Sequence, residues 1–188
     1  FAAILNSFQQ SYMSIKNRVN TISTRYNFIL LLWVNNISPV KVATLKAVND
    51  YNKAIKLDRF DPEGYVRRGR LYASQKEYDK AIADMDKAIS LDTSNPFAYF
   101  NRAIMYYEQE KYKEAMADLN EVLKEEPGNA LTLYNRGLIH AQLGAFEEAL
   151  EDMDRVLNIN PENVLASFNR ASIFIEMGMY RNALEDYD

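Results

Sequence analysis

The chain repeats itself with a period of 34 residues. Four features recur in one register: an alanine, an aromatic residue three positions before it, a small residue twelve positions before it, and an aspartate three positions after it. The alanines are Ala81, Ala115, Ala149 and Ala183, the aromatic residues are Tyr78, Tyr112, Phe146 and Tyr180, the small residues are Gly69, Ala103, Gly137 and Ala171, and the aspartates are Asp84, Asp118, Asp152 and Asp186. A period of this length is typical of stacked supersecondary units that bury their apolar faces on one another. The chain is therefore predicted to fold as a repeat protein.

Each unit carries the sequence pattern of two helices. The residues expected to cap the first helices with their side chains are Asp61, Asn95, Asn129 and Asn163. Pro62 and Pro96 follow at the first helical position, where a missing N–H has no cost. Gly144 and Gly178 suit the helix end at the turn of the later units. In the second unit we expect helices from about Pro96 to Gln109 and from about Lys113 to Glu125.

These patterns predict an all-α fold, a solenoid of antiparallel helix hairpins. Ser38 and Pro39 form a good helix start, and the register continues upstream, so a further helix is expected over about 39–57. Residues 1–38 are predicted to be an irregular segment, for which a helical conformation remains open. The solenoid is predicted over 39–188, divided into 39–60 (a partial repeat), 62–95, 96–129, 130–163 and a truncated 164–188. We expect the chain to be a piece of a longer protein.

The repeat resembles the tetratricopeptide repeat (TPR) family. The residues that carry the resemblance are Tyr99, Ala103, Tyr106, Tyr112, Ala115, Leu119 and Pro127 in the second unit, and Leu133, Gly137, Gly144, Phe146, Ala149 and Pro161 in the third. The pattern departs from the family where Thr93 replaces the usual proline and where Lys76 and Glu110 replace the usual glycine. The resemblance implies a right-handed superhelix that presents a concave surface to peptides or partner proteins.

A short motif separates two roles on the first helices. An arginine precedes each small residue, and an aspartate follows each arginine by 16 positions; the arginines are Arg68, Arg102, Arg136 and Arg170. Opposite charges on the inner face of both helices predict ion pairs, and the planar guanidinium suits a carboxylate. Asp50 has no arginine sixteen positions before it, so we expect that it pairs forward with Arg68 and that each aspartate bridges two units.

The residue before each arginine lies about 100° away around the helix and belongs to another face. We call this face of the first helices the trough. It is predicted to hold one asparagine per repeat between apolar and aromatic side chains, and an amide that donates and accepts at once can hold a peptide backbone. The expected peptide-binding residues are Arg67, Arg70, Phe97, Phe100, Asn101, Ile104, Tyr134, Asn135, Leu138, Phe168 and Asn169. The Lys/Arg clamp that some family members use for a C-terminal carboxylate is absent, because apolar residues occupy those places.

Composition narrows the function classes. Residues 62–188 hold 23 acidic and 14 basic side chains, which argues against binding nucleic acid. There is no cysteine and only one histidine, so no metal or cofactor is expected, and no catalytic motif is present. The longest apolar run, residues 28–34, is far shorter than the roughly 20 residues that a membrane helix needs. The compartment is not determined by the sequence and is taken as cytoplasmic by default.

The sequence thus predicts a non-catalytic interaction scaffold that binds a peptide or a partner helix in the trough. Two alternatives remain open at this stage. In the first alternative, the protein is a structural module of a larger multi-protein assembly, and another part of its own chain fills the trough. In the second, it is the specificity domain of a larger enzyme.

Overall fold

The computed structural model describes residues 39–187, and the predictions for residues 1–38, including the apolar run, lie outside this range. By its internal contacts the chain divides into two units, Phe1–Asn49 and Asp50–Asp188. Helix α2 (Pro39–Leu57) begins in the first unit and ends in the second, and it confirms the helix predicted over 39–57.

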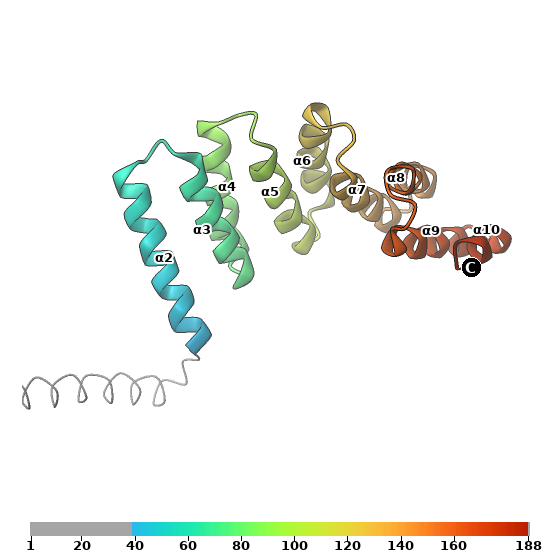
Figure 1. The fold of residues 1–188 in the computed structure, drawn as a ribbon, viewed down its shortest axis with the longest axis horizontal. Coiled ribbons are helices and arrows are strands. Elements are labelled where there is room, and N and C mark those ends of the chain that lie inside the picture. The colour runs from blue at the N-terminus through green and yellow to red at the C-terminus, as the bar shows by residue number, and fades with distance from the viewer. Residues whose placement is uncertain (1–38, 188) are drawn as a thin grey trace, which may run out of the picture. The chain divides into compact units, whose positions relative to one another are not determined.

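The second unit continues with helix pairs joined by short turns, and their order is visible in Figure 1. The helices are α3 (Pro62–Ser74), α4 (Tyr78–Leu91), α5 (Pro96–Glu108), α6 (Tyr112–Glu125), α7 (Ala130–Gln142), α8 (Phe146–Ile159), α9 (Val164–Glu176) and α10 (Tyr180–Tyr187). Within a repeat, α3 packs on α4, α5 on α6, α7 on α8 and α9 on α10, and each second helix also packs on the next first helix. The fold is an all-α solenoid of antiparallel hairpins, as predicted.

The predicted N-caps fix where the first helices begin. The side chains of Asp61, Asn95, Asn129 and Asn163 accept hydrogen bonds from backbone N–H groups of the first turns of α3, α5, α7 and α9. These bonds are 2.9–3.1 Å long and satisfy donors that have no partner within the helix. The caps place the trough residues of successive repeats in the same register.

The turn inside each hairpin requires a left-handed backbone at one position. Gly144 and Gly178 adopt φ values of 75° and 74°, which glycine accepts without a steric cost. Lys76 and Glu110 occupy the same place in the earlier repeats with φ values of 61° and 59°. The two departures from the glycine pattern therefore keep the turn geometry, at a cost in backbone strain.

The recurring small residues lie where the two helices of a hairpin cross. A methyl group added at Gly69 would lie 2.5 Å from Met85 Cε and 3.1 Å from the carbonyl oxygen of Ala81. Ala103 and Ala171 fill the same place in other repeats and are fully buried. The small residue of the first helix therefore lies directly against the second helix, where a larger side chain would hold the two helices apart.

The described part of the chain contains no helix that is long and apolar enough to cross a membrane.

Candidate functional site

Neighbouring side chains on the first helices serve two different surfaces. Arg102 points between the helices of the repeat, and Asn101 lies on the trough. The same division recurs in α7 and α9, as the roughly 100° between consecutive helical residues requires. One surface is a closed polar network, and the other is open.

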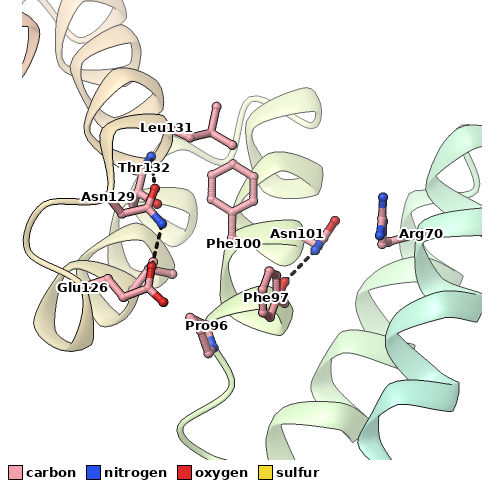
Figure 2. A pocket seen from close by; sticks show the side chains of 10 residues that line it. Arg70, Pro96, Phe97, Phe100, Asn101, Glu126, Asn129, Leu131 and Thr132 are labelled. Carbon is pink, nitrogen blue, oxygen red and sulfur yellow. Dashed lines mark hydrogen bonds between the residues drawn. The ribbon is translucent and has the colours of Figure 1, made fainter. Parts of the chain in front are cut away.

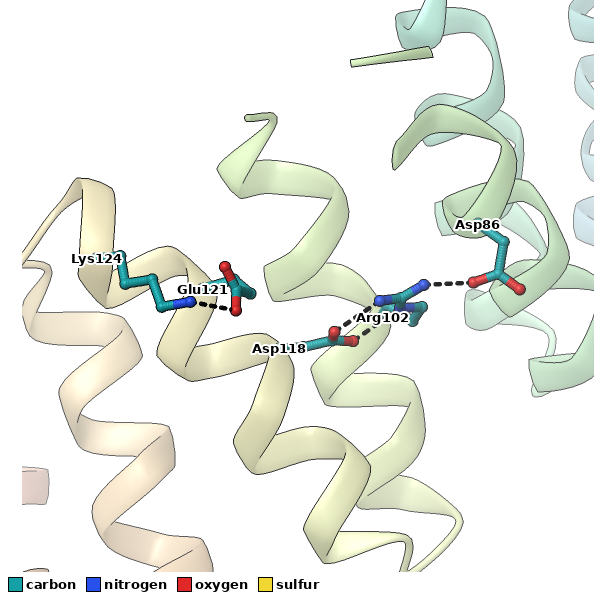
Figure 3. A network of polar contacts seen from close by, with 5 residues as sticks. All are labelled: Asp86, Arg102, Asp118, Glu121 and Lys124. Atoms are coloured by element: carbon teal, nitrogen blue, oxygen red, sulfur yellow. Dashed lines mark hydrogen bonds and ion pairs between the residues drawn. The ribbon is translucent and has the colours of Figure 1, made fainter. Parts of the chain in front are cut away.

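The arginines form the polar network predicted from the sequence. Arg102 donates to both carboxylate oxygens of Asp118, with Nε–Oδ2 2.8 Å and Nη2–Oδ1 2.7 Å (Figure 3). The same two-bond contact joins Arg68 to Asp84, Arg136 to Asp152 and Arg170 to Asp186. All four pairs expected at a spacing of sixteen residues are confirmed. We call this series the ladder.

The prediction that each aspartate bridges two repeats is wrong. The third nitrogen of each arginine makes that link, because Nη1 donates to a residue on the preceding second helix. Arg102 Nη1 lies 2.5 Å from Asp86 Oδ1, and the corresponding acceptors of the other arginines are Asn52, Asn120 and Asp154. Asp50 pairs with Lys53 on its own helix at 3.3 Å and makes no bond to Arg68. Each arginine therefore ties its own helix to the helices before and after it.

Burial and hydrogen bonding shift the pKa values of a ladder pair in opposite directions. The hydrogen bond to Asp118 raises the pKa of Arg102, and burial works against it. Burial raises the pKa of Asp118, which is 4% exposed, while the bond from Arg102 lowers it. The guanidinium remains charged at any pH at which the protein folds. Because desolvation offsets much of the attraction, the pair acts mainly as a geometric constraint.

The trough asparagines all orient their amides in the same way. Each Nδ2 donates to the carbonyl oxygen four residues earlier: Asn101 to Phe97 at 2.6 Å, Asn135 to Leu131 at 2.8 Å and Asn169 to Leu165 at 2.7 Å. A carbonyl oxygen can only accept a hydrogen bond, so the end of the amide that contacts it must be the NH₂ group, and this assigns the nitrogen and the oxygen of each side chain. The side-chain oxygen of each asparagine is left to accept from outside the helix.

Asn169 differs from the other two asparagines. Its Nδ2 also donates to the hydroxyl oxygen of Tyr134 at 2.9 Å, across the junction between two repeats. Both amide hydrogens of Asn169 are therefore used within the chain. Asn101 and Asn135 each keep one amide hydrogen outside such contacts in the part of the chain that the structure describes.

A hollow of about 380 Å³, which we call pocket 1, opens at the N-terminal ends of α5 and α7. Figure 2 shows Phe100 of α5 beside Leu131 and Thr132 of α7, with Phe97 and Asn101 of α5 on the side of Arg70. Its remaining lining comes from neighbouring elements: Arg70, Pro96, Val122, Glu126 and Asn129. Apolar side chains form most of the walls, and polar groups stand at the rim.

A second hollow of about 350 Å³, which we call pocket 2, lies at the C-terminal ends of α7 and α9. It is lined by Leu138, Ala141, Gln142, Phe146, Asn169, Ser172, Ile173 and Glu176. Helix α7 contributes to both pockets, with its first turn at pocket 1 and its last turn at pocket 2.

The structure brings some of the predicted site residues together and leaves others apart. Arg70, Phe97, Phe100 and Asn101 line pocket 1, and Leu138 and Asn169 line pocket 2. The predicted residues that line neither pocket are Arg67, Ile104, Tyr134, Asn135 and Phe168. Arg67 is paired with Glu63 of its own helix, with Nε 2.7 Å from Oε1.

Sequence reasoning missed the contributions of the second helices and of the loops. Val122 and Glu126 come from the end of α6 and from the loop after it, and Phe146 begins α8. Asn129 was expected only as a cap, yet it lines pocket 1 and also donates to Glu126 at 2.7 Å. The 34-residue register held a usable clue, because it places the end of each second helix beside the start of the next first helix.

The trough exposes large apolar side chains. Phe97 is 71% exposed and Leu131 59% exposed, and Leu165 and Phe168 are also exposed. Exposed aromatic and aliphatic groups that line adjacent hollows are typical of interaction surfaces. Within residues 39–187 no group of three or more His, Asp or Glu side chains is arranged to hold a metal ion.

Comparison with known proteins supports the repeat assignment. One model of the tetratricopeptide repeat matches residues 100–164, and a second TPR model matches residues 69–109. No curated protein matches the chain by sequence. A MamA structure spanning residue 41 to the end, from Desulfovibrio magneticus RS-1, is 20% identical with a TM-score of 0.73, covering 87% of this chain and 90% of that one. At this identity the likeness shows the fold alone.

Two solved structures are more similar in sequence. YrrB, described as a TPR protein with an unusual peptide-binding site, is 28% identical with a TM-score of 0.66, covering 73% of this chain and 71% of that one. The first TPR of Spaghetti (RPAP3), solved bound to the HSP90 peptide SRMEEVD, is 28% identical with a TM-score of 0.61, covering 63% of this chain and 94% of that one. The period, the hairpin packing and these matches agree, and the chain belongs to the tetratricopeptide repeat family.

Proposed function

We propose that the chain is a non-catalytic protein-interaction scaffold that binds an extended peptide of a partner protein in the trough. The observation that carries the proposal is the combination of two apolar hollows with asparagine amides of fixed orientation along the same face. The hollows can take apolar side chains of a ligand, and the amides can take its backbone.

The asparagine geometry suits a peptide backbone. Asn101 and Asn135 turn their side-chain oxygens away from their own helices, so a ligand N–H can donate to each of them. A free amide hydrogen on each asparagine can donate to a ligand carbonyl. Such contacts are independent of the ligand's side chains, so sequence preference comes from the pockets.

The similar structures support this class of function. YrrB is described as having a peptide-binding site, and the Spaghetti domain was solved with a peptide. The buried aspartates of this chain offer no obvious alternative chemistry, because each is held by an arginine of the ladder.

A random dodecapeptide display library, selected on the full chain, tests the proposal. We expect the wild-type protein to enrich a family of peptides. The doubly substituted variant Asn101→Ala/Asn135→Ala should bind the same peptides at least about 10-fold more weakly, because roughly 1 kcal/mol is lost with each hydrogen bond. Affinity measured by calorimetry gives the size of the effect, and circular dichroism confirms that the helices persist.

The matched control is Asn158→Ala/Asn182→Ala, which removes two exposed asparagines of α8 and α10 that line neither pocket 1 nor pocket 2. It should leave peptide binding unchanged. If the enriched peptides bind the wild type and Asn101→Ala/Asn135→Ala equally well, the binding site lies outside the trough and the proposal is contradicted. A library from which no peptide is enriched would contradict it as well.

A further inference from the structure

The two pockets differ in electrostatic character. Arg70 lies at the rim of pocket 1, is exposed, and makes no hydrogen bond or ion pair with any residue in the described range. Glu176 lies at pocket 2, is exposed, and is likewise without a partner among those residues. One pocket therefore offers an uncompensated cation and the other an uncompensated anion.

The helix ends favour the same difference, two against one. Pocket 1 is lined by the N-terminal turns of α5 and α7, where the helix dipole is positive, and by the C-terminal end of α6, where it is negative. Pocket 2 is lined by the C-terminal turns of α7 and α9, where the dipole is negative, and by Phe146 at the positive start of α8. The dipole of α7 thus runs from the positive pocket to the negative one.

Pocket 1 also contains a carboxylate, which does not cancel the effect of Arg70. Glu126 accepts a hydrogen bond from Asn129 Nδ2 at 2.7 Å. Figure 2 shows Glu126 beside Asn129 and Arg70 beside Asn101, with Phe97 and Phe100 between the two charges. An acidic ligand group at the Arg70 rim is therefore separated from Glu126 by the aromatic wall.

The spacing of the pockets limits the ligand. Leu131 at pocket 1 and Leu138 at pocket 2 lie seven residues apart on α7, about 10 Å at a rise of 1.5 Å per residue. An extended chain covers this in about three residues at roughly 3.3 Å each. Apolar side chains that enter both pockets must therefore be separated by at least about three positions in the ligand, and the groups that meet Arg70 on α3 and Glu176 on α9 must be farther apart than that.

We propose that the trough selects a bipolar peptide: an extended segment with an acidic residue at pocket 1 and a basic residue at pocket 2, more than about three positions apart, with apolar side chains entering the pockets. This inference rests on the proposed function, since it names the chemistry of the peptide that the scaffold binds. The charges set which peptides are preferred and in which direction they lie, and the apolar contacts supply most of the affinity.

Charge reversal in the full chain tests the inference with the random dodecapeptide library as the probe. Wild-type protein should enrich peptides that carry an acidic and a basic residue at the stated separation. Arg70→Glu should remove the acidic preference alone, and Glu176→Lys the basic preference alone. A synthetic peptide selected on the wild-type protein should bind each variant about 5-fold more weakly, which is the scale of one exposed ion pair. Added salt should reduce the difference in affinity between the wild type and each variant.

The matched controls are Arg181→Glu and Glu185→Lys, which reverse exposed charges on α10 outside both pockets. They should leave the selected sequences unchanged. Enriched peptides without the charge pattern, or a pattern that survives both pocket variants, would overturn the inference and leave the proposed function in place. No enrichment by any form of the protein would overturn both. Self-association seen by light scattering, together with no enrichment of peptides, would assign the trough to a second copy and overturn the peptide inference.

Discussion

The ladder and the trough are built from adjacent residues of the same helices, yet they treat polar groups in opposite ways. On the ladder, the three nitrogens of Arg102 all find acceptors within the chain. On the trough, the amide of Asn101 makes one bond to its own helix and turns its oxygen outward. The difference indicates that the polar groups of the ladder serve the fold, whereas those of the trough are available to a ligand.

Burial follows the same division. The ladder aspartates Asp84, Asp118 and Asp152 are buried in the described part of the chain, whereas the trough exposes phenylalanine and leucine side chains. The core around these aspartates is apolar, so the buried carboxylates and the exposed phenylalanine and leucine side chains are the exceptions to the usual preference for apolar residues inside and charges outside. The ladder arginines account for the buried carboxylates, and a binding surface would account for the exposed apolar side chains Phe97, Leu131 and Phe168.

The largest expected loss of stability comes from a substitution on the ladder. Arg136→Ala leaves the buried carboxylate of Asp152 without its two strong hydrogen bonds. We expect a loss of about 3 kcal/mol in the free energy of unfolding, measured by urea denaturation. Arg155→Ala is the control, because Arg155 lies 4.0 Å from the same carboxylate and is more exposed.

The arginine control should cost less than about 1 kcal/mol. A joint change of Arg136 and Asp152 to apolar residues of similar size should recover much of the loss. Equal losses in the free energy of unfolding for Arg136→Ala and Arg155→Ala would show that the ladder ion pair stabilises the fold no more than an exposed charge does.

A substitution at Thr132, which lines pocket 1, should raise the free energy of unfolding instead of lowering it. Thr132 is fully buried, and its hydroxyl has no hydrogen-bond partner within the described residues. Thr132→Val keeps the shape and removes the unsatisfied group, so the free energy of unfolding should rise by about 1 kcal/mol. Thermal unfolding measures this, with Thr93→Val at an exposed position as the control. A clear loss of stability would mean that the hydroxyl is satisfied in solution.

The ladder steps are not equivalent, and a smaller substitution tests the difference. Arg102 reaches back to the carboxylate of Asp86, whereas Arg136 reaches back to the amide of Asn120. Asp86→Asn makes the two steps alike and should lower the free energy of unfolding by a few tenths of a kcal/mol, because Asp86 is exposed. High salt should remove most of the difference between the variant and the wild type.

The smallest expected effect lies next to the largest in the sequence. Asn135→Ala removes a side-chain bond to Leu131 on an accessible face, and alanine favours the helix. The change in the free energy of unfolding should stay within about 0.5 kcal/mol, measured in the same urea experiment as Arg136→Ala. A loss comparable to that of its neighbour would make the trough asparagines structural and weaken the proposed function.

Much of the fold could be predicted because its determinants are local and periodic. The capping asparagines, the helix-initiating prolines and the sixteen-residue spacing of arginine and aspartate each have one physical meaning within a hairpin. The link between repeats was assigned wrongly because it depends on where the third guanidinium nitrogen points. The series Asn52, Asp86, Asn120 and Asp154 was visible in the sequence, but choosing it over Asp50 required the relative rotation of two helices.

The site could be predicted only in part for a related reason. The periodic pattern places Asn101 and Phe97 on one face of α5, and the structure agrees. It does not say how far the loop after α6 brings Glu126 toward that face, nor that Arg67 is occupied by Glu63 while Arg70 is not. Pocket boundaries depend on side-chain rotamers and loop paths, which carry no period.

The three-way contact of each ladder arginine has a consequence for how the chain unfolds. In a linear array of repeats, stability is a sum of terms within repeats and between neighbours. Arg102 contributes to both kinds at once, because it holds α6 within its hairpin and α4 in the hairpin before it. Its removal would weaken the coupling at one junction, so the repeats on either side would melt in separate transitions. The ladder therefore governs cooperativity, and hydrogen exchange would locate the first opening at the broken step.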